Sequence, residues 1–418
     1  MEIYINNYKG FADTIIPICD VNFFVGENST GKTAVLNLLE ILTNMNFWFD
    51  PDFNPDGIEL GYFSEMVSQN SSDKTFFSIG AYLDESNRDK PYSGYVWLKF
   101  IEKESSPAVS EFRFISDNKS VWCYVEGKTK ITIKTKEIED GYSFADWIHD
   151  VEGYRNFKTI EEEGYAPFGI MRSIVVNELE GNGGSHAGTI VMPRRFNRFI
   201  WMAPIRAKAR RWYESYKVSF SPEGEHTPLF LKKYLSGTAT EAKRNAFVTA
   251  INEFGKNSGL FDEVIVKSDS KETPFALYVR YGNLCVNITN VGYGVSQVLP
   301  LVVEMLTSKE DSFAIQQPEV HLHPKAQAAF GELLYKVATN YKNRVIIETH
   351  SDYLINRFRY SVNKGRSKVN AQVVYFQRGD DGTQITTMPI DNKGQYEGDV
   401  PKSFMDFFFE EELKMLEM

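Results

Sequence analysis

The residues with the clearest chemistry form the segment from Gly26 to Thr33, which has the sequence GENSTGKT. Gly26 and Gly31 let the backbone turn tightly and present its N–H groups to phosphate oxygens. Lys32 can reach the β- and γ-phosphates of a nucleoside triphosphate, and the hydroxyl of Thr33 can ligate Mg²⁺. The spacing predicts a phosphate-binding loop for ATP and Mg²⁺, formed by Gly26, Glu27, Asn28, Ser29, Thr30, Gly31, Lys32 and Thr33.

Two elements must hold this loop in place. The apolar run Val21–Val25 comes directly before it and predicts a short buried strand. Directly after it, Val35, Leu36, Leu38 and Leu39 have the spacing of a helix with one buried face. A helix that starts at such a loop adds its unpaired N–H groups and the positive end of its dipole to the anion site.

A second helix start with anion-binding chemistry lies far downstream. The segment Asn290–Gln297, NVGYGVSQ, follows a predicted strand and precedes an apolar helix at Val298–Leu306. Two glycines and a serine at a helix N-terminus can bind an oxyanion, although a glycine-rich helix start is common. The candidate nucleotide contacts in this segment are Gly294, Ser296 and Gln297.

Two further buried strands end in polar side chains. The strand Ser312–Ile315 runs into QQPEVHLHP, and the segment RVIIETHS, residues 344–351, ends a third strand close to a histidine. In P-loop ATPases the residues after a strand placed like Ser312–Ile315 bind Mg²⁺ and orient the attacking water. A histidine here is more often structural, but its place next to the catalytic strand also suits a γ-phosphate sensor. The candidate catalytic residues are Gln316, Gln317, Glu319 and His350, with Gln316 and Thr33 as the metal ligands.

Composition limits the class of protein. The chain has 418 residues, 42% of them hydrophobic, which suits two or three domains with real cores. A net charge of −10 argues against a generally basic nucleic-acid coat. The three cysteines lie far apart without metal-ligand spacing, and we find neither a signal-peptide pattern nor a membrane span. We therefore predict a cytoplasmic protein with no membrane segment.

The pattern along the chain predicts four parts. Residues 1–60 form the N-terminal part of the nucleotide-binding core, and residues 61–200 form a β-rich insertion, because β-branched and aromatic runs alternate there with short polar turns. Residues 201–375 form the C-terminal part of the core. Residues 376–418 form a small C-terminal extension, which either packs on its parent domain or binds a partner.

One stretch, between Arg194 and Arg211, is strongly basic and rich in aromatic residues. It can be a solvated or domain-packing face, a contact for nucleic-acid phosphates, or a docking surface for an acidic partner. Its cations are Arg194, Arg195, Arg198, Arg206, Lys208, Arg210 and Arg211.

Four segments together resemble a known group of proteins: GENSTGKT, VGYGVSQVLP, QQPEVHLHP and IIETHSDYLINR. They resemble ABC-type ATPases of the SMC, RecF and OLD-like branch, and more closely the small bacterial AAA-family ATPases of anti-phage defence operons. Residues 201–213 and 221–228 also resemble segments of that group, and the C-terminal end is similar to a short domain found in one subset. The resemblance covers residues 1–45 and 200–418.

The resemblance implies an α/β P-loop NTPase fold of the ABC-ATPase type, with a mixed, largely parallel sheet and helices. It also implies a head-to-tail dimer or higher oligomer. ATP would bind the loop of one protomer, and Ser296 with the N–H groups near Gly294 of the other protomer would close on the γ-phosphate. Tyr8 or Phe11 would stack on the adenine or, equally well, belong to the core.

The chain departs from the family pattern at Gln316, where a carboxylate is expected. An amide can accept a hydrogen bond, but it has no charge for Mg²⁺ and cannot act as a general base. Three interpretations compete. Gln316 is an isosteric Glu→Gln replacement that holds ATP unhydrolysed, or Glu319 does its work, or the protein is a slow or inactive hydrolase that uses ATP as a gate.

The leading hypothesis is an ATP-binding, ATP-hydrolysing regulator in prokaryotic anti-phage defence. It would control a separate effector, expected to be a nuclease encoded in the same operon, because the sequence shows no nuclease motif of its own. One alternative is a RecF-like DNA-repair ATPase that contacts DNA through the Arg194–Arg211 stretch. The other is an ATP-gated scaffold that does not hydrolyse ATP.

Overall fold

The computed structural model divides the chain into two compact units, which we describe separately. The first comprises Met1–Ile18, Glu27–Phe196 and Phe376–Ile385, and the second comprises Cys19–Gly26, Asn197–Tyr375 and Thr386–Met418. The structure describes residues 1–55, 58–84, 93–116, 118–127, 130–139, 141–161, 167–180, 198–214, 219–236, 239–268 and 274–408.

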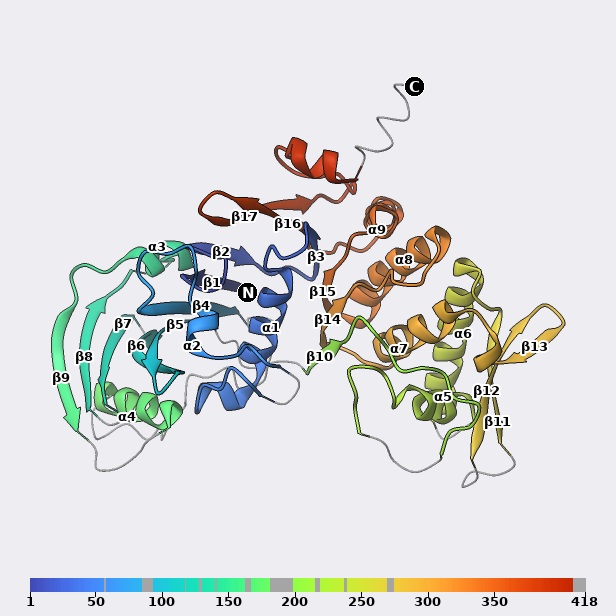
Figure 1. Ribbon diagram of the computed structural model, residues 1–418, viewed down its shortest axis with the longest axis horizontal. Helices are drawn as coiled ribbons and strands as arrows, with labels where there is room; N and C mark the ends of the chain where they lie inside the picture. The colour runs from blue at the N-terminus through green and yellow to red at the C-terminus, as the bar shows by residue number, and fades with distance from the viewer. Residues whose placement is uncertain are drawn as a thin grey trace. The chain divides into compact units, whose positions relative to one another are not determined.

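The first unit is built on an eight-stranded antiparallel sheet with the order β2-β1-β4-β5-β6-β7-β8-β9 (Figure 1). Strands β4 to β8 lie within residues 61–200, for which the sequence predicts a β-rich insertion. The two N-terminal strands also join this sheet, because β1 pairs along its whole length with β4. The strands are β1 (Glu2–Asn6), β2 (Thr14–Pro17), β4 (Phe76–Asp84), β5 (Ser93–Lys103), β6 (Ser106–Ser116), β7 (Lys119–Glu126), β8 (Lys130–Glu137) and β9 (Arg155–Glu161).

Short helices accompany this sheet. The helix that follows the predicted phosphate-binding loop is α1 (Lys32–Thr43), and its buried face contains the four apolar residues expected from the sequence, Val35, Leu36, Leu38 and Leu39. The others are η1 (Met45–Trp48), α2 (Phe63–Met66), α3 (Phe144–His149) and α4 (Phe168–Glu180).

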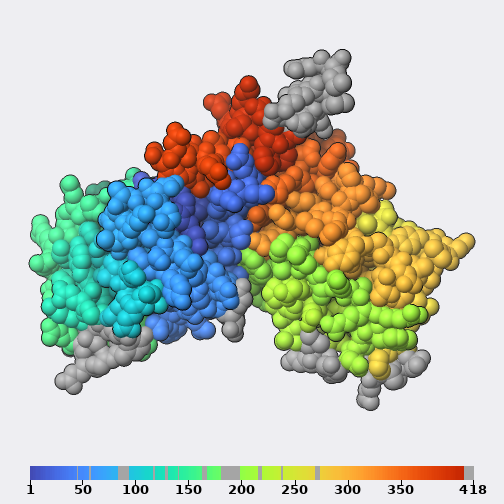
Figure 2. Space-filling view, in the orientation of Figure 1, coloured from blue at the N-terminus to red at the C-terminus, as the bar shows by residue number. Residues whose placement is uncertain are grey.

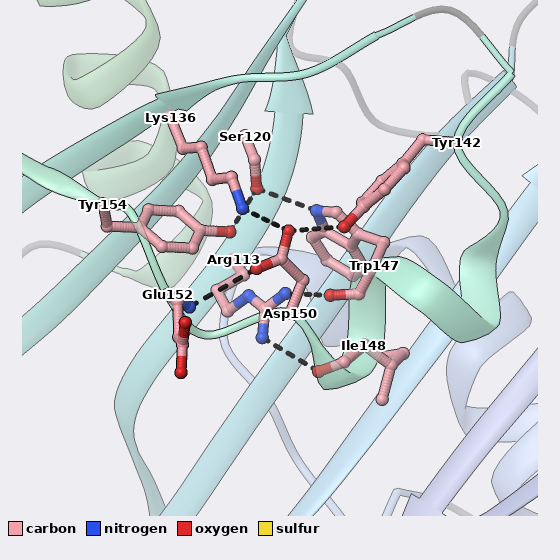
Figure 3. Close-up of polar contacts among 9 residues, drawn as sticks. All are labelled: Arg113, Ser120, Lys136, Tyr142, Trp147, Ile148, Asp150, Glu152 and Tyr154. Atoms are coloured by element: carbon pink, nitrogen blue, oxygen red, sulfur yellow. Dashed lines mark hydrogen bonds and ion pairs between the residues drawn. The ribbon is translucent and has the colours of Figure 1, made fainter.

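A buried arginine attaches α3 to the sheet (Figure 3). Arg113 on β6 is 1% exposed, and its guanidinium donates hydrogen bonds to the carbonyl oxygens of Ile148 and Trp147. These carbonyls lie at the C-terminal end of α3, where backbone oxygens have no partner within the helix. The rings of Trp97, Trp122, Trp147 and Tyr154 surround the cation at 4.5–5.8 Å. Arg113 therefore caps the helix from inside the core.

The second unit contains the strands expected to hold the nucleotide site. The sheet order is β10-β14-β15-β3-β16-β17, and the pairs β10·β14, β14·β15 and β15·β3 are parallel. Every residue of β3 and β14 is buried, as expected for parallel strands covered on both faces. The strands are β3 (Val21–Gly26), β10 (Phe199–Met202), β14 (Ser312–Gln316), β15 (Arg344–Glu348), β16 (Ala371–Gly379) and β17 (Gly382–Ile390), of which residues 376–385 belong to the first unit.

Three long helices of this unit, α7 (Tyr293–Thr307), α8 (Pro324–Tyr341) and α9 (Asp352–Lys364), lie beside β14 and β15 (Figure 1). They share one core with the strands, to which Phe313, Ile347 and Phe330 contribute. Further from the sheet are α5 (Thr227–Leu235), α6 (Glu241–Ser258), η2 (Ile288–Asn290) and a three-stranded antiparallel sheet of β11 (Glu263–Ser268), β12 (Phe275–Tyr281) and β13 (Leu284–Asn287).

The structure corrects several expectations. The predicted extension at 376–418 is not separate at its start, because β16 and β17 are strands of the six-stranded sheet. The helix predicted at Val298–Leu306 begins earlier, at Tyr293, so Pro300 lies inside α7 and removes one of its hydrogen bonds. Gly181–Gly188, predicted as a loop, lies outside the described residues, as do Arg194 and Arg195. Within the described ranges, no helix is both long and apolar enough to cross a membrane.

Candidate functional site

The GENSTGKT segment forms a tight loop that ends at the N-terminus of α1. Gly31 occupies the N-cap position with φ 91°, so it contributes no side chain to cap the helix. The Nζ of Lys32 donates to the carbonyl oxygen of Glu27 at 2.5 Å, and the hydroxyl of Thr30 donates to the same oxygen at 2.8 Å. These two bonds fold the loop back on itself, so that its backbone surrounds the start of the helix.

Several loop residues are open to solvent. Glu27, Asn28, Ser29 and Thr33 are exposed, whereas Lys32 is only 3% exposed. An exposed loop at a helix N-terminus, with a hydroxyl at Thr33, has the donors that a triphosphate and its metal ion require. The segment therefore forms a turn at the start of α1, as its sequence predicts, and phosphate binding by this loop stays a prediction.

In the second unit, three parallel strands bring their carboxyl ends to one edge of the sheet. The N–H of Thr349 donates to the carbonyl oxygen of Phe24 at 3.0 Å, and the N–H of Gln317 donates to that of Glu348 at 2.8 Å. The segments after β14 and β15 are thus held side by side, next to the end of β3. The loop continues directly from β3 after Gly26, where the chain passes into the first unit.

Glu319 connects the ends of β14 and β15. Its carboxylate accepts hydrogen bonds from the Thr349 hydroxyl at 2.8 Å and from the His350 N–H at 2.6 Å. Burial raises the pKa of Glu319, although these hydrogen bonds and the positive charge of Arg206 oppose the shift. Glu319, which our second interpretation gives the role of the carboxylate expected at Gln316, therefore lies at this edge. Its two oxygens already accept hydrogen bonds from Thr349 and His350.

The other predicted catalytic residues lie at the same edge. Gln316 is 8% exposed, and Gln317 has a left-handed backbone with φ 41°. A residue other than glycine rarely adopts this conformation, and such strain concentrates at functional sites. The His350 ring is half-buried and lies 6.0 Å from that of Phe407, which belongs to the C-terminal segment.

The donor set fits a magnesium ion only in part. Mg²⁺ usually keeps several waters and takes one or two protein oxygens together with substrate phosphates. Thr33 offers an exposed hydroxyl, but Gln316 offers a neutral amide oxygen. Among the residues that the structure describes, no three His, Cys, Asp or Glu side chains gather as a metal-binding group. The chain would hold the ion mainly through its nucleotide.

The start of α7 packs closely on the turn after β14. A Cβ on Gly294 would lie 2.6 Å from the carbonyl oxygen of His321, and the ring of Tyr293 meets that of His321 edge-on at 4.7 Å. The hydroxyl of Ser296 donates to the Tyr293 carbonyl oxygen at 2.8 Å, and this residue is 8% exposed. Gly294 is therefore required by close packing.

Gln297 has a different role from the predicted nucleotide contact. It is 1% exposed, and its amide pairs with the main chain of Arg206. The Arg206 N–H donates to Oε1 of Gln297 at 3.0 Å, and Nε2 of Gln297 donates to the Arg206 carbonyl oxygen at 3.2 Å. Both bonds would have to break before the amide reached a ligand.

The basic stretch is less exposed than its composition suggests. Arg206 is 2% exposed, so it cannot belong to a DNA- or partner-binding surface. Arg198 pairs with Glu304 at 3.1 Å, and Arg210 pairs with Glu225 at 3.3 Å. Figure 2 shows the yellow-green chain near residue 200 on the visible face of the second unit. Among the described residues of this stretch, Lys208 and Arg211 are exposed and form no ion pair with a carboxylate.

Sequence reasoning did not single out Arg206 from this stretch. Its position after the apolar run at Phe199–Met202, at the end of a strand, is the pattern that would have indicated it. The two aromatic candidates for adenine stacking, Tyr8 and Phe11, are both 0% exposed and belong to the core. Phe11 packs against the loop itself, because a Cβ on Gly31 would lie 2.6 Å from its ring.

An exposed phosphate-binding loop between a buried parallel strand and a helix defines an α/β protein of the P-loop nucleoside triphosphatase type. A family model described as AAA ATPase domain matches residues 1–163 and 223–355, more than half of the chain. The protein therefore belongs to this ATPase family.

Other comparisons give only distant similarity. No curated protein gives a significant match to the sequence. An SMC head bound to the C-terminal winged-helix domain of ScpA aligns at 13% identity and a TM-score of 0.44, over 93% of this chain and 97% of that chain. The SMC head domain from Thermotoga maritima aligns at 11% identity and a TM-score of 0.41, over 93% and 98% of the two chains.

Proposed function

We propose that this chain binds ATP with Mg²⁺ and uses it as a dimeric molecular switch that hydrolyses ATP slowly. The observation that supports this most strongly is the exposed GENSTGKT loop, which follows β3 directly. In the sheet that contains β3, β14 ends at Gln316 and β15 ends at Glu348, and Glu319 and His350 follow these strand ends. Lys32 and the loop N–H groups would bind the phosphates, and Thr33 would help to hold Mg²⁺. The bound ion would neutralise charge on the phosphate oxygens.

Slow hydrolysis follows from the proton balance. A water oxygen bonds to the γ-phosphorus, the bond to the β-phosphate oxygen breaks with its electron pair, and the water must release a proton. The Gln316 amide cannot accept that proton. Glu319 can do so, and its raised pKa makes it a better base, but it would first have to release Thr349 or His350.

The test compares the chain that has Gln316 with the variant Gln316→Glu. Both should bind ATP equally, while turnover should rise by about 10²-fold or more in the variant, because a positioned general base contributes factors of that order. Gln395→Glu, the same change at an exposed position, is the matched control. If both chains bind ATP and neither hydrolyses it, the non-hydrolysing scaffold is the better interpretation. If neither binds ATP, the proposal fails.

At the level of the cell, we propose that the switch controls a separate effector in anti-phage defence. The support is the sequence resemblance to small defence ATPases. The partner is expected to be a protein of the same operon, and co-purification of the two proteins with and without ATP tests it. A chain that is recovered alone under both conditions would contradict this role.

The DNA-repair alternative is less well supported, because Arg206 is buried and Arg198 and Arg210 pair with glutamates. It still predicts DNA binding that weakens as the salt concentration rises. The slope of log affinity against log salt concentration should become shallower by about one unit for each phosphate contact removed. DNA binding measured over a salt series on wild type and Arg211→Ala would show this slope. No binding at low salt would exclude the alternative.

A further inference from the structure

Arg206 contacts two elements of the second unit, the start of α7 and the end of β14. Through its main chain it pairs with Gln297 on α7, and through Nη2 it donates to the carbonyl oxygen of Gln316 at the end of β14, at 2.9 Å. These partners are 91 and 110 residues away in sequence. One buried residue therefore connects the start of α7 to the catalytic edge of the sheet.

Stability alone does not explain a guanidinium at this place. Its Nε and Nη1 atoms are buried, and neither has a hydrogen-bond partner in the described part of the chain. Buried donors without acceptors destabilise the folded state. Burial also lowers the pKa of Arg206 to about 10, and the charge of Glu319 opposes that shift. An apolar side chain would fill the space at a lower cost, which indicates that the cation serves a function.

The two elements would serve different nucleotides in a head-to-tail dimer. Gln316 ends β14 and Glu319 follows it, in the sheet where β15 joins β14 to β3, the strand that leads into the protomer's own phosphate-binding loop. Ser296 and Gly294 at the start of α7 would face the nucleotide on the partner's loop. A contact that links α7 to the end of β14 would therefore link the two nucleotide sites.

We infer that Arg206 is a positioning residue that couples the start of α7 to the end of β14 and thereby makes ATP binding at the two sites of the dimer cooperative. The dimer part of this inference rests on the proposed function. The link between the elements does not, because its contacts exist within one chain.

The first experiment tests the link without nucleotide, by hydrogen exchange of the full chain. Gln297→Met keeps the volume of the side chain and removes both bonds to Arg206. It should speed exchange of amides in residues 316–322 as well as in α7, by about tenfold, which corresponds to the loss of about 1.4 kcal/mol of local stability. Arg206→Lys should have the same effect. In the double variant the loss of local stability should be smaller than the sum of the losses in the two single variants. If Gln297→Met changes α7 and residues 203–207 alone, the link is refuted.

The second experiment measures ATP binding at equilibrium over a range of concentrations. Wild type should show a Hill coefficient above 1, and Arg206→Lys should lower it to about 1 while the half-saturation point moves by less than about threefold. If Arg206 had a purely structural role, its substitution would instead weaken ATP binding and leave the Hill coefficient unchanged. Arg210→Lys, an exposed arginine in the same stretch, is the matched control and should behave as wild type.

The two experiments separate the possible failures. If wild type binds no ATP, the proposed function fails, and hydrogen exchange still decides whether Arg206 links the elements. If Arg206→Lys does not fold, Gln297→Met alone decides both experiments, since it breaks the same link from the other side. A Hill coefficient that stays at the wild-type value in the folded variant would overturn the inference.

Discussion

Glu40 shows how one carboxyl group makes α1 sensitive to pH. Its Oε2 atom is buried without a hydrogen-bond partner in the described part of the chain. This burial raises the pKa of Glu40 to about 7 from an ordinary value of 4.5. The folded state therefore binds this proton more tightly than the unfolded state does. It follows that the free energy of unfolding decreases as the pH rises from about 4.5 through 7.

We predict that Glu40→Gln removes this dependence. The variant should melt about 2–4 °C above wild type at pH 8, where the wild-type carboxyl is ionised, and at nearly the same temperature at pH 5. Differential scanning calorimetry at the two pH values measures the difference. Glu59→Gln, the same change at an exposed position, should show no such pattern. Equal shifts at both pH values would mean that a change in packing, and not ionisation, is responsible.

At the scale of elements, the loop depends on the backbone of Gly31. Its φ of 91° is strained for any L-residue, and an added Cβ would lie 2.6 Å from the ring of Phe11. Because Phe11 belongs to the core, it cannot easily move away. The glycine therefore serves both the turn and the packing of the loop on the N-terminal strands.

Gly31→Ala should consequently lower ATP affinity by at least about tenfold and the free energy of unfolding by about 2–3 kcal/mol. Gly127→Ala is the control, because this glycine has a φ of 68° but nothing within 4 Å of an added Cβ. It should cost only about 1 kcal/mol and leave ATP binding unchanged. Calorimetric titration with ATP and urea unfolding separate the two effects. Equal losses in both variants would mean that the backbone conformation alone matters.

The attachment of α3 offers a second prediction for an element. Arg113→Met keeps most of the side-chain volume, but it removes the cation that caps α3 inside the ring of aromatic residues. We expect the free energy of unfolding to fall by about 3 kcal/mol, since two charge-assisted hydrogen bonds are lost.

Tryptophan fluorescence during urea unfolding reports this change directly, because three of the surrounding rings are tryptophans. Arg155→Met on the exposed β9 is the control and should change stability by less than about 0.5 kcal/mol. A wild-type unfolding curve for Arg113→Met would show that packing alone holds α3.

At the scale of the whole molecule, the proposed dimer makes Lys32 and Ser296 act on the same nucleotide from different chains. Lys32→Ala should abolish ATP-dependent dimerisation, because the loop loses its charge-assisted contact to the phosphates. Ser296→Arg should abolish it as well, because a long side chain at the start of α7 blocks closure.

A mixture of the two variants should dimerise again with ATP, since one composite site of the heterodimer contains neither change. Analytical ultracentrifugation of each variant and of the mixture tests this. A mixture of Lys32→Ala with Gly31→Ala is the control, because both changes damage the loop and no intact site can form. Failure of the first mixture to dimerise, when wild type does, would place Lys32 and Ser296 at the same site within one chain.

The local sequence pattern was sufficient to predict many of the helices and strands of this protein. The sequence alone determined the strand, loop and helix around Lys32, because a buried strand, a glycine turn and an amphipathic helix each depend on residues close in the chain. The same is true of the antiparallel strands β4 to β8, whose side chains alternate between the two faces of the sheet. The chemistry expected of the loop followed from these neighbouring residues.

Only the tertiary structure decided what happens where distant segments meet. It placed Arg206 in the interior and bonded it to Gln297, which lies 91 residues away. It also put Glu319 onto Thr349 and His350, and added β16 and β17 to the sheet. The physical reason is that burial and hydrogen-bond partners depend on which segments pack together, and no local pattern records this. A basic residue in a basic stretch looks exposed until the strand beside it is known.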